Sequence, residues 1–160
     1  MPIVLTRIDN RLIHGQVAVS WCSEVNANLI VVVDDKVQKD KTQQMLLDMA
    51  APHGVSTRYF SVEEAITKLP KAGPNQKIFL IAREVNVFVK LAQGGIPIKK
   101  INVGNMHFKE GKKQISSAIS VDEQDVNDFK KLNELGIECE AKRVPTENGT
   151  DMMKLIKEAE

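Results

Sequence analysis

Two short runs of apolar residues constrain the fold of this chain more than any other feature. Leu29–Val33 and Ile78–Ala82 each contain five consecutive apolar residues, most of them branched or aromatic. A strand with one wet face alternates polar and apolar residues, so continuous runs indicate strands that are covered on both faces. We interpret the shorter segments 3–5 and 101–103 in the same way. These four segments predict a parallel sheet enclosed between helices.

The intervening segments have the periodicity of helices. Four of them place mostly apolar residues at the i, i+3, i+4, i+7 spacing of one buried helix face. These sets are Thr42, Met45, Leu46 and Met49; Val62, Ala65, Ile66 and Leu69; Val85, Phe88, Val89 and Ala92; and Met152, Leu155, Ile156 and Ala159. Alternating strands and helices predict an α/β fold, with a doubly wound, mainly parallel open sheet and helices on both faces.

Local signals predict where two of the helices begin. Ser61 with Glu64, and Ser120 with Glu123, have the spacing of a capping box, in which a hydroxyl and a carboxylate satisfy free backbone amides. Segment 113–121 fits neither period well, and we predict that it forms a short edge strand of the sheet.

Size and composition restrict the class of protein. The 160 residues contain no repeat or linker, so we expect one domain over residues 1–160. A net charge of +1 and an aromatic content of 4% argue against nucleic-acid binding. Cys22 and Cys139 are too far apart in sequence to suggest a disulfide framework. The chain shows no signal-peptide pattern and no apolar run of membrane-spanning length, so we expect a cytoplasmic location.

Polar segments follow three of the predicted strands. His14 lies after the first strand, Asp34 and Asp35 follow the second, and residues 102–105 end a later one. Ligands of open α/β sheets bind beyond the carboxyl ends of the strands, near a topological switch point. We therefore expect these segments to meet in one crevice.

His14 is the strongest candidate for chemistry. It lies at a strand-to-helix turn, where backbone amides and the helix dipole favour a bound anion. Neutral imidazole is a nucleophile, the guanidinium of Arg11 matches phosphate oxygens, and Asp9 can hold the ring or Arg11. Phosphate-binding or supporting roles are further predicted for Arg7, Gly15, Gln16, Asp35 and Asn105.

Simpler explanations exist for several of these residues. Arg7 could simply carry a charge to the sheet edge or pair with Asp9. Asp34 and Asp35 could either bind Mg²⁺ or form a polar turn at a helix entry. His53 fits a structural role at a helix end, whereas His107 could contact an anion. The sequence lacks the glycine-rich loops of nucleotide sites and the spacing of zinc ligands, so we expect no cofactor and no metal.

The segment RIDNRLIHGQV at residues 7–17 resembles the phosphorylation-site motif of IIB subunits in the mannose/fructose/sorbose family of the bacterial sugar phosphotransferase system. Similar landmarks follow in order along the chain: VVDD at 32–35, GGI at 94–96, INVGNM at 101–106 and SVD at 120–122. Asn10 departs from the pattern, since members often carry an acid there. GNMH at 104–107 and KRVPTE at 142–147 are most similar to the N-acetylgalactosamine/galactosamine branch, with the mannose branch also near.

This resemblance implies a mainly parallel seven-stranded sheet and a phosphocarrier. His14 would accept a phosphoryl group on Nδ1 from phospho-IIA, with Arg11 offsetting phosphate charge and Asp9 as orienting support. The group would then pass to a sugar held by the membrane subunits IIC and IID, so that the protein acts as a protein-phosphohistidine–sugar phosphotransferase. The implied location is cytoplasmic, with peripheral association to the membrane transporter, and the implied partners include no nucleic acid.

Two other functions stay open on the residues alone. The same crevice could belong to a regulatory domain that binds a small anion without catalysis. A hydrolase that uses Cys22 as its nucleophile is a second alternative, and it predicts inactivation by thiol alkylation.

Overall fold

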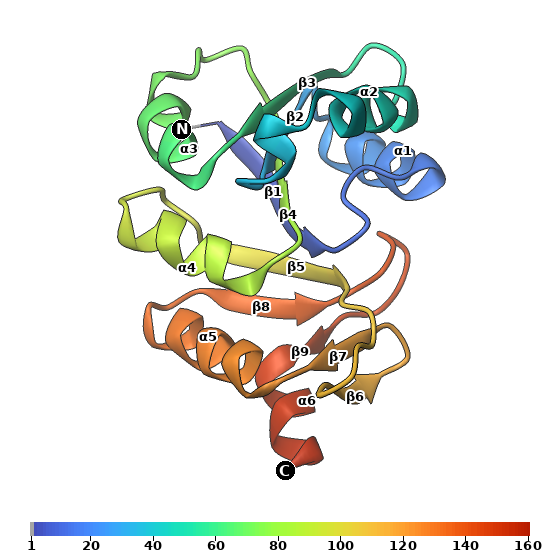
Figure 1. Ribbon diagram of the computed structural model, residues 1–160, viewed down its shortest axis with the longest axis vertical. Coiled ribbons are helices and arrows are strands. Elements are labelled where there is room, and N and C mark those ends of the chain that lie inside the picture. The colour runs from blue at the N-terminus through green and yellow to red at the C-terminus, as the bar shows by residue number, and fades with distance from the viewer. Residues whose placement is uncertain (1) are drawn as a thin grey trace.

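A seven-stranded sheet forms the centre of the structure, a computed structural model that describes residues 2–160 (Figure 1). The strand order is β3-β2-β4-β1-β5-β8-β9. All neighbours pair in parallel except β9, which is antiparallel to β8. The strands are β1 Ile3–Asp9, β2 Leu29–Val33, β3 Ser56–Phe60, β4 Ile78–Ala82, β5 Lys100–Asn105, β8 Glu138–Ala141 and β9 Thr150–Asp151. The predicted α/β class and mainly parallel sheet are confirmed.

Helices cover both faces of this sheet. They are α1 Gly15–Val25, α2 Lys41–Ala50, α3 Val62–Lys68, α4 Val85–Gln93, α5 Glu123–Glu134 and α6 Met152–Ala159, with short 3-10 turns at Val37–Lys39 and Leu69–Lys71. Successive residues of β2 enter different cores: Ile30 clusters with side chains of α1 and α2, and Val31 with side chains of α3 and α4. Every side chain of β2 and β4 is buried, whichever face of the sheet it points to. This burial explains the continuous apolar runs.

The chain leaves neighbouring strands toward opposite faces. The segment after β1 enters α1, which packs in the same core as α2, whereas the segment after β4 enters α4 in the other core. β1 lies between β4 and β5 in the sheet, so the carboxyl end of β1 is a topological switch point. This is where the sequence predicts the functional crevice.

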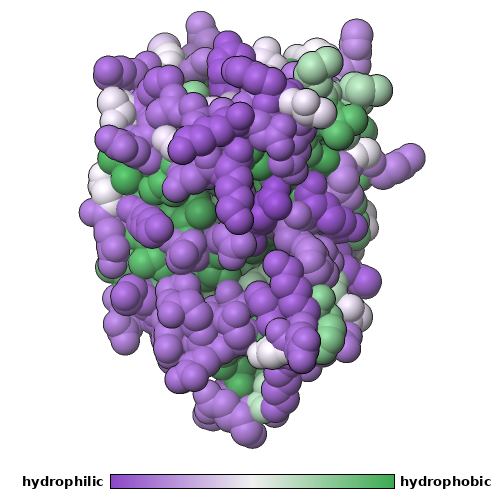
Figure 2. Space-filling model, viewed as in Figure 1, coloured by the Kyte–Doolittle hydropathy of each residue, from purple (hydrophilic) through white to green (hydrophobic). Residues whose placement is uncertain are grey.

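The predicted buried face of α2 is wrong, although the helix itself is present. Met45, Leu46 and Met49 are 67%, 62% and 83% exposed, and Leu47 is the buried apolar residue of the helix. Figure 2 shows apolar side chains at the surface in the region where α1 and α2 lie in Figure 1.

Polar contacts explain the orientation of α2. The Gln44 side chain donates to the Val37 carbonyl at 2.8 Å, and Tyr59 Oη on β3 donates to Asp48 Oδ1 at 2.6 Å. These bonds hold the polar side of α2 toward the protein. Periodicity detects the spacing of apolar residues, but it does not reveal which side of a half-polar helix contacts the sheet.

Segment 113–121 also differs from its prediction. It forms a separate antiparallel hairpin of β6 Lys113–Ser116 and β7 Ile119–Val121, instead of one edge strand of the sheet. Its two-residue turn lacks the glycine or asparagine that usually marks a hairpin, so the sequence gives no turn signal.

One of the two predicted capping boxes is correct. Ser61 and Glu64 cap α3 reciprocally, as expected. Ser120 is instead buried in β7. The residue that caps α5 is Asp122, immediately before the helix, and it forms the capping box with Asp125. Aspartate at both positions supplies the same acceptors as the expected serine and glutamate, and this shifts the helix start by two residues.

Candidate functional site

The loop after β1 carries His14 back to the start of α1. The Leu12 amide donates to the Asp9 carbonyl at 3.0 Å, which closes a tight turn. Leu12 has a positive φ of 59°, a conformation that costs a residue with a Cβ roughly 1–2 kcal/mol. Its side chain is buried with Ile13 in the core beneath α1 and α2, and this burial offsets the cost. The apolar pair therefore anchors the loop.

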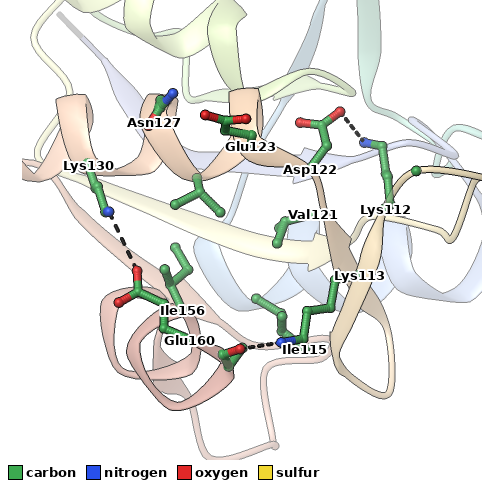
Figure 3. Close-up of a pocket in the computed structure, with 13 residues that line it drawn as sticks. Lys112, Lys113, Ile115, Val121, Asp122, Glu123, Asn127, Lys130, Ile156 and Glu160 are labelled. Atoms are coloured by element: carbon green, nitrogen blue, oxygen red, sulfur yellow. Dashed lines mark hydrogen bonds and ion pairs between the residues drawn. The ribbon is translucent and has the colours of Figure 1, made fainter.

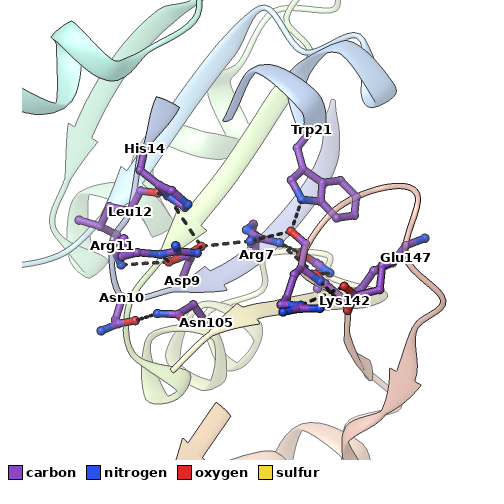
Figure 4. A network of polar contacts seen from close by, with 12 residues as sticks. Arg7, Asp9, Asn10, Arg11, Leu12, His14, Trp21, Asn105, Lys142 and Glu147 are labelled. Atoms are coloured by element: carbon purple, nitrogen blue, oxygen red, sulfur yellow. Dashed lines mark hydrogen bonds and ion pairs between the residues drawn. The ribbon is translucent and has the colours of Figure 1, made fainter. Parts of the chain in front are cut away.

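His14 lies immediately before the first turn of α1, with its side chain 26% exposed. Its Nδ1 is 3.2 Å from the Leu12 carbonyl oxygen and 3.9 Å from Asp9 Oδ2. Figure 4 shows the ring beside Leu12, Arg11 and Asp9. Its Nε2 is buried. The ring is therefore within reach from outside, but its two nitrogens have different surroundings.

Asp9 is the centre of the polar network. Its carboxylate has no exposed surface and accepts from Arg7 Nη2 at 3.1 Å. It also accepts from the Arg11 backbone amide at 3.0 Å and from Arg11 Nε and Nη2 at 3.2 and 3.3 Å. The sequence left open whether Asp9 holds the ring or Arg11. In the structure it bonds both arginines, and the ring nitrogen lies beyond ordinary hydrogen-bond distance.

The two arginines on Asp9 have different environments. Arg11 is 48% exposed beside His14, so its guanidinium is available to an incoming phosphate. Arg7 is 1% exposed and donates to the Asn102 side chain and to the carbonyls of Lys142 and Arg143. Burial lowers the pKa of Arg7, while Asp9 acts to raise it. Arg7 therefore does not face solvent, and it supports the site through its hydrogen bond to Asp9.

Three residues without a predicted role complete the surroundings of Arg7. Trp21 places its ring centroid 5.5 Å from the guanidinium carbon and donates Nε1 to the Arg143 carbonyl at 3.1 Å. A Cβ on Gly104 would lie 2.0 Å from Arg7 Nη2, so only glycine leaves space for the guanidinium. Asn102 supplies the acceptor on β5. The sequence places Asn102 and Gly104 in a segment expected at the crevice, but it predicts neither their contacts with Arg7 nor any role for Trp21, because these contacts form across the sheet.

Three of the other residues with a predicted supporting role, Gly15, Gln16 and Asn105, lie around the loop that carries His14. Gly15 and Gln16 are exposed in the first turn of α1, beside His14. Asn105 donates its side-chain amide to Asn10, whose own amide is 3.1 Å from His107 Nε2. Gly15 and Gln16 therefore lie on the α1 side of the His14 loop, and Asn105 contacts this loop from β5.

The acidic pair after β2 has structural contacts. Asp35 accepts from the Val62 amide at 2.9 Å and so ties the loop to α3. Asp34 accepts from the amides of Lys36 and Val37 and forms an ion pair with Arg83 at 3.0 Å. Between residues 2 and 160, no group of three or more histidine, cysteine or acidic side chains is arranged to hold a metal ion.

The two cysteines are poor nucleophiles. Both are buried, and burial raises the pKa of Cys22 to about 11 and that of Cys139 to about 12. A thiol with such a pKa is protonated near neutral pH, so it lacks the reactive thiolate. This environment argues against the hydrolase alternative.

Across the described residues, no helix is long and apolar enough to cross a membrane.

The arrangement around His14 is suited to phosphate chemistry. The first amides of α1 have no partner within the helix and, together with the helix dipole, favour a negative charge beside His14. Arg11 adds a forked donor at the same place. An imidazole between these groups can form a bond to phosphorus while its surroundings offset the charge of the phosphoryl oxygens.

Known proteins share this chain's sequence and fold. The family model of the PTS system sorbose subfamily IIB component matches residues 3–160. The N-acetylgalactosamine-specific phosphotransferase enzyme IIB component 1 of Escherichia coli K12 is 51% identical over 144 residues, or 89% of this chain and 91% of that protein. The mannose-specific EIIAB component of the same strain is 43% identical over 158 residues, or 98% of this chain and 49% of that protein.

A solved structure agrees with these sequence matches. The crystal structure of the IIBSor domain of the sorbose permease from Klebsiella pneumoniae has a TM-score of 0.94 and 32% identity, covering 100% of this chain and 99% of that one. Family model, sequence relatives and fold all agree. The chain therefore belongs to the sorbose-subfamily IIB components of the phosphotransferase system, within the mannose/sorbose family.

Proposed function

We propose that His14 is the phosphoryl carrier of this IIB component. The observation that carries the proposal is the position of a partly exposed imidazole between Arg11 and the first turn of α1. Membership in a family of sugar phosphotransferases supplies the reaction class. His14 would accept the phosphoryl group from a phosphohistidine of IIA and deliver it to a sugar during uptake through IIC and IID, at the cytoplasmic side of the membrane.

Both steps are simple displacements at phosphorus. In the first, a ring nitrogen of His14 forms an N–P bond as the N–P bond of the IIA donor breaks. In the second, a sugar hydroxyl oxygen bonds to phosphorus, the bond to His14 breaks, and the hydroxyl proton is released. Since one N–P bond replaces another, the first step should be close to balanced and reversible. Arg11 and the α1 amides then contribute positioning and charge stabilisation.

Nδ1 is the better candidate for the attacking nitrogen. Nε2 is buried, so a phosphoryl group could reach it only if the ring moved. Nδ1 is 3.2 Å from the Leu12 carbonyl, which can only accept a hydrogen bond, so Nδ1 carries a proton in this arrangement. Attack therefore requires the proton to move from Nδ1 to Nε2 and the contact with Leu12 to break.

Names of relatives support the partners and the substrate class. The mannose-specific relative is an EIIAB component and is about twice as long as the region matched here, which supports IIA as the donor. The relative at 51% identity is N-acetylgalactosamine-specific, so we propose N-acetylgalactosamine or galactosamine as the sugar. Mannose is the alternative, because the mannose-specific relative is 43% identical.

Phosphorylation in a reconstituted system tests the carrier. The protein is incubated with phosphoenolpyruvate, the general phosphotransfer proteins and IIA, and its mass is measured before and after acid treatment. We expect a gain of one phosphoryl group that acid removes, and complete loss of this gain in His14→Ala. His53→Ala and His107→Ala are matched controls and should keep it. Phosphorylation of a folded His14→Ala protein would refute the assignment. An unmodified wild-type protein would favour the anion-binding alternative.

A further inference from the structure

Two buried nitrogens next to the proposed phosphorylation site have no hydrogen-bond partner among the described residues: His14 Nε2 and Arg7 Nε. His14 and Arg7 also line the same small cavity, whose volume is about 10 Å³. The rest of its lining is apolar and includes Ala18 of α1, Ile30 of β2 and Phe79 of β4. The two residues that carry these unpaired nitrogens therefore both line one otherwise apolar cavity.

The dimensions and chemistry of the cavity fit one small polar ligand. Buried polar atoms are nearly always hydrogen-bonded, so two unpaired nitrogens at one cavity need an explanation. A volume of about 10 Å³ is at the lower limit for one water molecule, which needs at least two polar partners. Arg7 Nε can only donate, whereas His14 Nε2 can donate or accept.

We propose that this cavity binds one water molecule, which bridges Arg7 Nε and His14 Nε2 and allows the His14 proton to change nitrogen. The inference deepens the proposed function and rests on it. In the arrangement described here, Nδ1 carries the proton, facing the Leu12 carbonyl. The water then accepts from Arg7 Nε and donates to the free Nε2.

The same water also satisfies the reactive form of the ring. For Nδ1 to attack phosphorus, solvent must take up the Nδ1 proton and return one to Nε2, so that the ring carries one proton in both forms. The water oxygen can then accept from Nε2–H and from Arg7 Nε–H at once, because it has two lone pairs. A direct contact between Arg7 Nε and Nε2 would put two donors together in this form.

The wild-type protein allows the first test. In the unphosphorylated full chain labelled with ¹⁵N-histidine, we expect His14 to show a protonated Nδ1 and a magnetisation-transfer signal from a bound water to its ring hydrogens. A high-resolution crystal structure should show one water between Arg7 and His14. Absence of the water in both measurements would overturn the inference.

A cavity-filling variant provides the second test. Ala18→Val adds two methyl groups at the cavity, so we expect loss of the water signal, altered ¹⁵N shifts of His14 and about tenfold slower phosphorylation, the size expected for one lost hydrogen bond. Ser20→Val introduces the same residue at an exposed position of α1 and should change none of these. Unchanged His14 signals in a folded Ala18→Val protein would also overturn the inference.

The two proposals fail in different ways. If His14 becomes phosphorylated but no water contacts its ring, the water site is wrong and the carrier function stands. If the water is present but His14 never accepts a phosphoryl group, the carrier function is wrong. The ¹⁵N measurement needs no phosphoryl donor, so the two results are independent.

A larger cavity, with a volume of about 490 Å³, lies between the β6–β7 hairpin, α5 and α6. Figure 3 shows the side chains that line it. Two of its three lysines form ion pairs, Lys112 with Asp122 and Asp125, and Lys130 with Glu160, and Lys113 donates to the Ala159 carbonyl.

Discussion

One face of the central sheet has two regions, and side chains of different chemistry cover each of them. Over β2 and β4, the side chains that point to this face are Ile30, Val32, Phe79 and Ile81, and they pack against α1 and α2. Over β1 and β5, the same face carries Arg7, Asp9 and Asn102, because their strand neighbours Ile8, Ile101 and Val103 point to the opposite core. This second region is covered by Trp21 of α1 and by Lys142 and Arg143 of the loop after β8.

The two regions use different interactions to hold the loop with His14. The apolar region fixes Leu12 and Ile13 by burial. The polar region fixes Asp9, and through it Arg11, by hydrogen bonds from Arg7, which is itself held by β5 and the loop after β8. Burial is non-directional, whereas a network of charge-assisted bonds sets the orientation of each group. We infer that the polar region sets the geometry of the site and the apolar region supplies its stability.

Removal of the Arg7 charge should give the largest effect. Arg7→Met removes the only fully buried cation that pairs with the buried Asp9 among the described residues, so we expect the free energy of unfolding, measured in urea, to fall by about 3–5 kcal/mol. Transfer to His14 should also fail in the folded fraction, because Asp9 no longer holds Arg11 in one position.

Arg58→Met is the matched control for Arg7→Met. Arg58 is exposed on β3, and its loss should change the unfolding free energy by less than about 0.5 kcal/mol. Similar losses in the two variants would show that the buried network does not stabilise the fold, and the contrast between the two regions would fail.

An intermediate effect is expected in the apolar region. Val32→Ala removes two buried carbons from a residue with no exposed surface, so we expect about 2 kcal/mol lower stability. The rate of phosphoryl transfer, measured well below the unfolding midpoint, should stay at the wild-type value. A strong loss of transfer in this variant would mean that the apolar region also sets the site geometry.

The sequence predicts the apolar region better than the polar one. β2 and β4 were predicted to the residue, because burial on both faces makes every position apolar. β3 and β9 lie at the edges of the sheet, and β8 is a short strand beside β9, so their mixed sequences gave no strand signal. Edge strands need fewer apolar residues, and with fewer apolar residues the periodic pattern that identifies a strand is weaker.

The candidate site shows the same limit. His14, Arg11 and Asp9 were found from local spacing, and the loop brings them together as expected. That Arg7 is buried could not be predicted, because its partners on β5 and in the loop after β8 lie 95 to 136 residues away in sequence. Local pattern identifies charged residues near a reactive group, but it does not tell which of them face solvent.

The smallest effect on stability, with a clear effect on function, is expected for Arg11→Lys. The guanidinium is half exposed, so its ion pair with Asp9 contributes less than about 1 kcal/mol to stability. An ammonium keeps the charge but cannot bond Asp9 and a phosphate with one planar fork. We therefore expect roughly tenfold or greater slowing of transfer from phospho-IIA, measured by rapid quench.

The matched control for Arg11→Lys is Arg58→Lys, which makes the same exchange at an exposed position on β3 and should leave the rate unchanged. Equal rates for wild type and Arg11→Lys would mean that the α1 amides alone offset the phosphate charge. A loss of several kcal/mol in stability would mean that Arg11 belongs to the buried network with Arg7. Either result would remove the distinction between a guanidinium that orients the site and one that serves the transferred group.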